Sequence, residues 1–187
     1  MMIVKKLQDF IRESRGASLV EFTLLLPLLV TICLGIYETT NYVLLKAKLD
    51  EIATGIATWV SAETSTATIT DCLIGANLMG ASYNFSANGS VVVSGLQQVG
   101  TTSSQKLVWQ QASVGGVSKI TTNPSTGVVT AAPFTILLDT NVIVVEVTYK
   151  YTPVFTYFLG VFPAVTLLRI GQTVPTGTNP FTPLSAT

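Results

Sequence analysis

The most pronounced feature of the sequence is a long apolar segment near its beginning. Residues 17–37 contain one charged side chain, Glu21, and residues 23–37 contain none. At 1.5 Å per residue, a helix over this segment is about 30 Å long, which matches the hydrocarbon thickness of a bilayer. The pattern therefore predicts a helix that crosses a membrane.

Beyond this segment the apolar residues recur with the period of a helix that has one buried face. They advance by four, three, four and three residues: Leu45, Leu49, Ile52, Ile56 and Trp59. The positions between them are charged or polar: Lys46, Lys48, Asp50, Glu51, Thr54 and Thr58. Such a stripe is typical of a helix packed on a globular domain. We expect one continuous helix from Ala17 to about Ser61, with its second half packed in this way.

From residue 63 onward the sequence is rich in Ser, Thr, Asn and Gly. Residues 64–70 are predicted to be a polar linker, and residues 71–79 a short helix or an irregular loop. Short alternating runs then predict strands over residues 90–97, 105–112, 117–121, 128–131, 141–151 and 164–173, separated by turn signals such as Asn88-Gly89 and Gly115-Gly116. A helix followed by strands predicts an α+β fold, in which a long N-terminal helix, transmembrane in its first half, packs on a small antiparallel sheet.

Composition and charge narrow the possible functions. Charged residues make up 11% of the chain, against about 25% in ordinary globular domains, and the formal net charge is zero. Without a basic surplus, nucleic-acid binding has no electrostatic basis. The chain has no histidine and two cysteines, Cys33 and Cys72. These facts argue against a histidine-based active site, a metal centre or a cofactor site. We therefore expect no enzyme, no catalytic residue, no metal and no cofactor.

The charges near the N-terminus predict the orientation of the apolar helix. Lys5, Lys6, Arg12 and Arg15 all precede the apolar segment. The positive-inside rule places them in the cytoplasm and the domain after Tyr37 on the far side of the membrane. This arrangement divides the chain into a cytoplasmic leader (1–16), a long helix (17–62) and a β-rich head (63–187).

The residues around Glu21 form a motif. The run Gly16-Ala17-Ser18-Leu19-Val20-Glu21-Phe22 follows a short basic leader and opens the apolar helix. It resembles the class III signal of type IV pilin-like proteins. The Glu21-Phe22 pair and the runs at residues 24–29 and 35–38 resemble TadE-like minor pilins, or pseudopilins, of the tight-adherence (Tad) branch. The run at residues 145–153 is similar to a strand and its Tyr-x-Tyr-x-Pro exit in the same family.

The resemblance implies a function for several of these residues. A prepilin peptidase would cut between Gly16 and Ala17, since a glycine lets the backbone enter an extended cleft without a side-chain clash. Glu21, next to Phe22, would then pair with the new Ala17 ammonium of a neighbouring subunit and fix the register of assembly. Pro27 would kink or locally open the helix, because it lacks an N–H group.

The same resemblance implies partners and a location. The partners would be prepilin peptidase, other pilin subunits, the Tad inner-membrane assembly machinery and the lipid bilayer. The protein would be a single-pass protein of the bacterial inner membrane with a periplasmic head, or extracellular once assembled into a pilus. It would take part in pilus assembly, adhesion or surface attachment.

Other interpretations of the N-terminus remain open at this point. A type II secretion pseudopilin would share the cleavage chemistry. An ordinary secretory signal has a shorter apolar core and a small-x-small cleavage site, which the residues after Gly35 do not offer. A signal-anchored periplasmic domain that binds a ligand or a partner would keep its leader, so the N-terminus of the mature protein separates it from a pilin.

Overall fold

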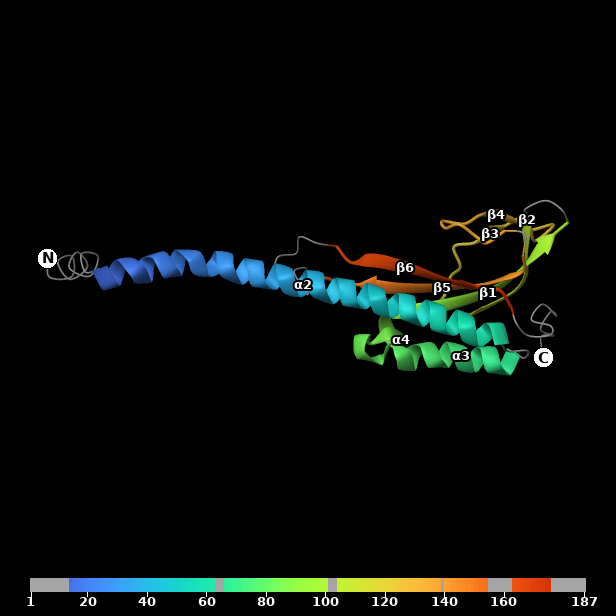
Figure 1. Cartoon of the computed structure of the whole chain (residues 1–187), viewed down its shortest axis with the longest axis horizontal. Helices are drawn as coiled ribbons and strands as arrows, with labels where there is room; N and C mark the ends of the chain where they lie inside the picture. Colours follow the sequence, from blue (N-terminus) through green and yellow to red (C-terminus); the bar gives the residue numbers. More distant parts are fainter. Residues whose placement is uncertain (1–13, 63–65, 101–103, 139, 155–162, 176–187) are drawn as a thin grey trace. The chain divides into compact units, whose positions relative to one another are not determined.

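The computed structural model describes residues 14–62, 66–100, 104–138, 140–154 and 163–175, without the side chains of residues 14–17 and 66–68. The helices are α2 (Ser14–Ala62), α3 (Thr66–Met79) and α4 (Phe85–Asn88), with a 3-10 turn η1 (Ala81–Tyr83). The strands are β1 (Gly89–Val99), β2 (Ser104–Ala112), β3 (Thr121–Thr122), β4 (Val129–Ala131), β5 (Val142–Tyr151) and β6 (Val165–Thr173) (Figure 1). The chain forms two units, residues 1–43 and residues 44–187, and α2 contributes to both.

The described part of the first unit consists of the first half of α2. Side chains from Ser18 to Cys33 are all exposed, including leucines such as Leu24 at 74% and Leu28 at 56%. Threonine hydroxyls in this stretch donate back to carbonyl oxygens one turn earlier, as Thr23 does to Leu19 at 2.8 Å. The backbone and the hydroxyl groups therefore use hydrogen bonds within the helix, while the apolar side chains have no cover from the described residues.

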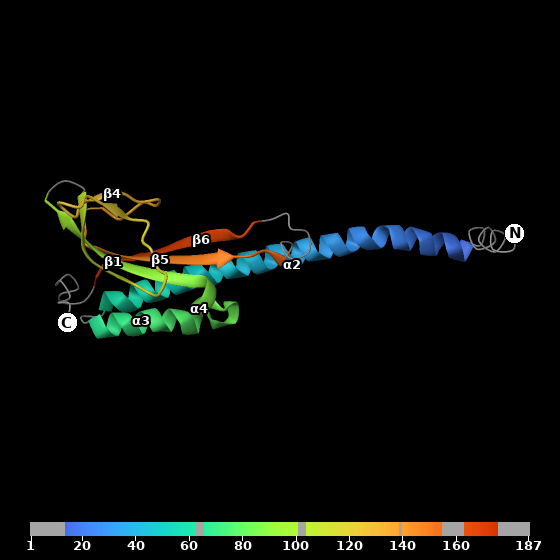
Figure 2. The ribbon, with the colours of Figure 1, turned by 180° about the vertical axis from the view of Figure 1, so that it is seen from behind.

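The second unit is built on a four-stranded antiparallel sheet with the order β2-β1-β5-β6. Strand β5 lies at its centre, with Val145 opposite Val93 of β1 and opposite Gly171 of β6. The short β3–β4 pair is joined to β2 by a bridge between Lys106 and Val128. In Figure 1 the second half of α2 passes in front of the sheet with α3 beside it, and in Figure 2, turned by 180°, the strands lie in front of α2.

Both faces of the central strand β5 are buried. On one face, Leu96, Val142 and Val144 form a cluster with Ile120 from the segment that crosses the sheet between β2 and β3. The opposite face of β5 carries Ile143, Val145 and Val147, and all three are fully buried. The alternation seen in the sequence is thus correct for the side-chain directions, but residues 142–147 are buried on both faces of the strand.

The second half of α2 packs on this unit through the predicted stripe, with one correction. Leu45, Leu49, Ile52 and Ile56 are at most 1% exposed, as the spacing predicts. The prediction that Trp59 belongs to the buried stripe is wrong: its side chain is 47% exposed, and Val60 is the buried residue of that turn. The Trp59 ring lies over Gly75 of α3, where a Cβ atom would come within 2.9 Å of the ring.

Gly171 of β6 sets how closely the sheet approaches α2. A Cβ atom at this position would lie 2.2 Å from the backbone oxygen of Ala53 in α2. Because real Cβ atoms do not approach backbone atoms so closely, glycine is required for this packing distance. The backbone of the edge strand β6 at Gly171 and that of α2 at Ala53 are thereby in direct contact.

Two further predictions are corrected. Residues 66–70 belong to α3 and are not a linker, because Ile69, Leu73 and Ala76 follow helical spacing and are buried. The strand predicted over residues 117–121 is reduced to Thr121–Thr122. The preceding residues are held by side-chain contacts with β5 rather than by strand pairing. The other predicted strands are found within two residues of their expected bounds, and the expected α+β fold, with its long apolar N-terminal helix and small antiparallel sheet, is confirmed.

Candidate assembly site

The predicted cleavage position lies in α2, close to the first residue that the structure describes. Gly16 and Ala17 follow Ser14, the first described residue of this helix. Glycine lowers helix stability by about 1 kcal/mol relative to alanine. Gly16 therefore weakens the helix at the predicted cleavage position.

Glu21 stands alone on an apolar surface. Its side chain is exposed, and the neighbouring Leu19, Val20 and Phe22 are 50–59% exposed. Among the described residues, Glu21 has no hydrogen-bond or ion-pair partner. A carboxylate is costly in lipid, so a lone acid in such an apolar segment is a candidate functional site.

Pro27 lies inside α2, and the helix continues through it. Because proline has no N–H group, the carbonyl of Thr23 loses its usual helical partner. The carbonyl of Pro27 itself accepts a hydrogen bond from the Thr31 hydroxyl at 2.8 Å. The structure thus places Pro27 in the middle of the exposed apolar segment, and its proposed effect on the helix stays a prediction.

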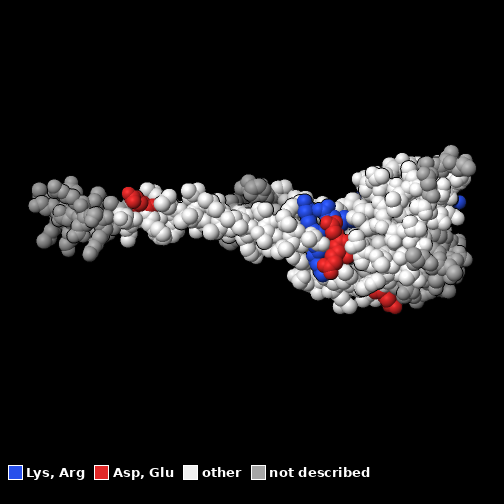
Figure 3. Space-filling view, viewed as in Figure 1, with Lys and Arg blue, Asp and Glu red and all other residues white. Residues whose placement is uncertain are grey.

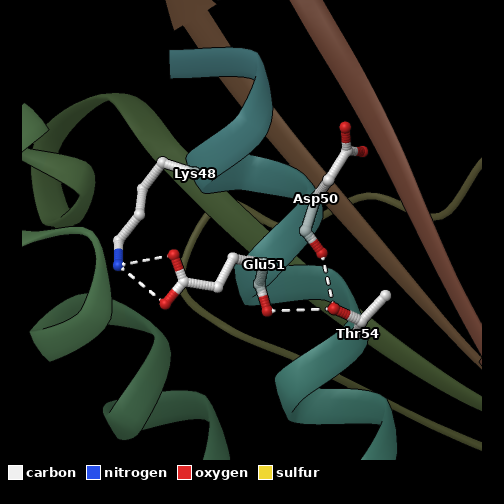
Figure 4. A network of polar contacts seen from close by, with 4 residues as sticks. All are labelled: Lys48, Asp50, Glu51 and Thr54. Carbon is white, nitrogen blue, oxygen red and sulfur yellow. Dashed lines mark hydrogen bonds and ion pairs between the residues drawn. The ribbon is translucent and has the colours of Figure 1, made fainter. Parts of the chain in front are cut away.

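The start of the second unit carries the main group of charges. Lys48 donates to both carboxylate oxygens of Glu51 at 3.0 and 2.9 Å (Figure 4). Arg169 of β6 forms an ion pair with Asp50 at 3.2 Å. Figure 3 shows a band in which basic side chains lie directly beside acidic ones, while most of the remaining visible surface is uncharged. The Asp50 and Glu51 side chains stay 57% and 59% exposed, so both carboxylates remain accessible.

Two contacts that join distant segments of the second unit were not predicted from the sequence. Glu146 of β5 is 1% exposed, and its carboxylate accepts hydrogen bonds from the Lys119 N–H at 2.7 Å and from the Ser118 hydroxyl. It thereby fastens the segment before β3 to the sheet. The second contact is the Arg169–Asp50 pair. Each joins residues more than 20 positions apart, so only the strand positions of Glu146 and Arg169 could be read from the sequence.

Tyr149, near the end of β5, contacts Tyr83 and Phe85. The Tyr149 hydroxyl donates to the carbonyl of Tyr83 at 2.7 Å, and its ring stacks on Phe85. Burial raises the pKa of Tyr149 above its ordinary value of 10.0, and the neighbouring Tyr83 raises it further, while a side-chain hydrogen bond with Asn88 opposes the shift. The neutral phenol is therefore the form that the fold stabilises.

The described residues do not contain three His, Cys, Asp or Glu side chains placed to share a metal ion. Cys33 is exposed on α2 and Cys72 is buried in α3. Within residues 18–62, α2 is long and apolar enough to cross a membrane, and none of its most apolar window is buried. The arrangement offers an apolar helix surface with one acid, and no group of side chains suited to catalysis among those described.

Comparison with known proteins identifies the N-terminal region. Residues 16–57 match the family described as TadE-like protein. No curated protein and no solved structure matches the chain. TadE-like proteins belong to the Tad pilus system, and the family is structural rather than enzymatic. The match covers the apolar half of α2 and the stripe that packs on the head. The resemblance predicted from Gly16, Glu21 and Phe22 is therefore confirmed, and residues 16–57 of this chain are TadE-like.

Proposed function

We propose that this protein is a minor pilin of a Tad-type pilus. Prepilin peptidase cuts it between Gly16 and Ala17, and the first half of α2 then passes from the bacterial inner membrane into a filament. The leader is cytoplasmic and the head periplasmic, and the head becomes extracellular when the filament leaves the cell. The protein acts as a structural subunit and as a substrate of the peptidase, in pilus assembly and surface attachment.

One observation carries this proposal. The apolar side chains from Ser18 to Cys33 are all exposed, although the stripe of Leu45, Leu49, Ile52 and Ile56 in the second half of the same helix is buried. Exposed apolar patches of this size mark surfaces that lipid or another protein covers. A membrane anchor alone would account for the apolar side chains, but it would leave the carboxylate of Glu21 in the span without a partner, which costs free energy. Pairing with the Ala17 ammonium of a neighbour offsets that cost, which supports the pilin interpretation.

The first test is the mass and N-terminal sequence of the mature protein from cells with an active prepilin peptidase. We expect a chain that begins at Ala17. Replacement of Gly16 by Val should block cleavage, because the side chain would clash in an extended peptidase cleft. A wild-type chain that keeps its first sixteen residues would exclude the cleavage and would favour a signal anchor.

The second test separates cleavage from assembly. In Glu21→Ala we expect cleavage to persist and the amount of protein in sheared filaments to fall by about tenfold or more, because the register contact is lost. Glu38→Ala removes an acid from the same unit outside the apolar segment and serves as the matched control, with little expected change. Wild-type incorporation of Glu21→Ala would contradict the proposed role of Glu21.

A further inference from the structure

The two edges of the four-stranded sheet differ in how they are protected. The register of β2 on β1 shifts between Gly95 and Leu96, and the outer side of β2 is bridged to the β3–β4 pair, where the Leu107 N–H donates to the carbonyl of Gly127 at 2.9 Å. Strand β6, at the other edge, pairs with β5 over nine residues without a shift. It has no proline and one charged residue, Arg169. Because natural sheets block exposed edges with bulges, prolines, charges or covering segments, β6 is the less protected edge.

The pairing pattern shows which backbone groups of β6 face outward. In an antiparallel sheet, successive residues direct their N–H and C=O groups to opposite neighbours. Val91 of β1 exchanges hydrogen bonds with Ser113, which follows β2, so odd-numbered residues of this part of β1 face β2. Val93 therefore also faces β2, and Val145, opposite to it, faces β6. Val145 is in turn opposite Gly171, so the odd-numbered residues of β6 face β5 and the even-numbered ones face outward.

Three of the outward-facing residues form an open edge: Thr166, Leu168 and Ile170. Among the described residues, their N–H groups have no acceptor on the outer side, and the only donor to their carbonyls is the Arg169 guanidinium, which lies 3.4 Å from the Leu168 oxygen. The next outward residue, Gln172, binds residues 135–137 through its side-chain amide, at 2.9 and 2.6 Å. Figures 1 and 2 show β6 on the side of the sheet away from α3.

An extended segment of another chain fits this edge chemically. An added strand pairs with the free N–H and C=O groups, and its alternate side chains lie beside those of the edge strand. The side chains of Leu168 and Ile170 are half-buried, so they can pack further against apolar residues of an added strand. The partner is therefore an extended segment with apolar residues at alternate positions.

The sheet edges of a second copy of this chain fit less well. The outer side of its β2 is already bridged to β3–β4. Antiparallel pairing of two β6 strands would turn the two molecules, and with them the two α2 helices, in opposite directions. Subunits inserted in one membrane have the same direction, so this arrangement does not suit a pilus. A different subunit is the better source of the strand.

We propose that β6 accepts an extended segment of a different subunit of the same filament as a fifth strand of the sheet, along residues 166–170. The proposal rests on the proposed function, because the partner is a subunit of the pilus. It adds that the head joins the filament through its sheet as well as through α2.

Hydrogen exchange of the full chain in detergent, followed by NMR, tests whether the edge is open. The outward amides of Leu168 and Ile170 should exchange at least about tenfold faster than the inward amides of Leu167 and Arg169, because only the inward ones belong to the β5–β6 ladder. Equal protection would mean that another part of the same chain covers the edge, and would overturn the proposal.

Two substitutions at one position test the pairing itself. Thr166→Pro and Thr166→Ala both remove the hydroxyl group, but only proline removes the outward N–H. We expect at least about fivefold less of the proline variant in sheared filaments, while both heads unfold at nearly the same denaturant concentration, since an outward N–H on an edge strand tolerates proline. Equal incorporation of the two variants, beside a wild-type protein that does enter filaments, would overturn this proposal alone. Absence of the wild-type protein from filaments would overturn the proposed function as well.

A pair of lysine substitutions avoids any effect of proline on folding. Val165 begins β6 and is 46% exposed, and Val114 is fully exposed in a turn of the same unit. Val165→Lys should lower incorporation by at least about threefold, because a lysine on an open edge prevents the addition of a strand. Val114→Lys makes the same change away from the edge and should alter incorporation by less than about twofold. Equal effects of the two lysines would contradict the pairing at β6.

Photo-cross-linking in purified filaments tests the choice of partner. With p-benzoylphenylalanine at position 165, mass spectrometry should identify a cross-linked peptide from a different filament subunit. A cross-link to a peptide of this protein's own sequence would overturn the choice, because a second copy or the same chain would then cover the edge.

Discussion

The two halves of α2 have similar apolar residues but opposite environments. In the first half Ile32 is 48% exposed and Leu24 is 74% exposed, while in the second half Ile52 is buried completely and Leu49 is 1% exposed. The second half has a sheet and α3 to cover it, whereas the described residues provide no cover for the first. Hydrophobicity alone thus does not decide burial. An exposed apolar surface of this kind is typical of one that lipid or another protein covers, which agrees with the proposed pilin role.

The largest difference in the free energy of unfolding is expected when the same substitution is made in each half of α2. Ile52→Ala creates a cavity in the packed half and should lower the free energy of unfolding of the head by about 2–5 kcal/mol. Ile32→Ala, in the exposed half, should change it by less than about 0.5 kcal/mol. Denaturant unfolding of the full chain in detergent, followed by tryptophan fluorescence, measures both. Equal losses would show that the first half also packs on the head.

A second comparison uses two glycines with different surroundings. Gly171→Ala places a Cβ atom against the backbone of Ala53 and should destabilise the head by about 1–3 kcal/mol. Gly35 of α2 has no heavy atom within 4 Å of the added Cβ position. Gly35→Ala should therefore increase the helix content by circular dichroism and leave the unfolding of the head unchanged. A stable Gly171→Ala variant would contradict the close contact between β6 and α2.

The third comparison is between a buried and an exposed acid. Glu146→Gln loses one acceptor where the Ser118 hydroxyl and the Lys119 N–H both donate, and should cost about 1–2 kcal/mol. Hydrogen exchange should become faster around residues 118–120. Glu51→Gln weakens one exposed ion pair, and the expected change is below about 0.5 kcal/mol. Similar losses in the two variants would mean that Glu146 does not fasten this segment.

The smallest effect concerns alkaline pH. The folded pKa of Tyr149 is raised by burial, so above pH 10 the unfolded chain loses this proton more readily than the folded one. The contribution of Tyr149 is therefore complete below pH 10 and is lost as the pH rises through the folded pKa. Tyr149→Phe should reduce the loss of stability between pH 9 and 11, measured by thermal unfolding at each pH. An unchanged pH profile would assign the loss to other groups.

Much of the fold follows from the sequence because hydrophobic periodicity reports local geometry. The alternation in residues 141–151 predicted β5, and the spacing from Leu45 to Ile56 predicted the packed face of α2. The helical start of α3 was missed because its polar residues hid the stripe of Ile69, Leu73 and Ala76. Trp59 was misplaced because its environment depends on Gly75, a residue of another helix.

Only the part of the candidate site that lies in one short stretch of sequence could be predicted. Gly16, Glu21 and Phe22 belong to one short motif, so the sequence was enough to propose them, and they lie within the residues that match the TadE-like family. Their proposed roles involve a peptidase and a neighbouring subunit, which a single chain does not contain. Asp50 was recognised as a charged position, but its partner Arg169 is brought to it by the order of the strands.

The back-bonded threonines of α2 have a consequence for how the helix selects its surroundings. Thr23, Thr31, Thr39 and Thr40 each donate their hydroxyl proton to a carbonyl of their own helix. In hydrocarbon, these hydroxyl groups need no hydrogen-bond partner outside their own helix. The carboxylate of Glu21 does need one, and hydrocarbon cannot provide it. Within residues 18–37, Glu21 is therefore the one position where hydrocarbon cannot take the place of a polar partner, as the proposed pairing between subunits requires.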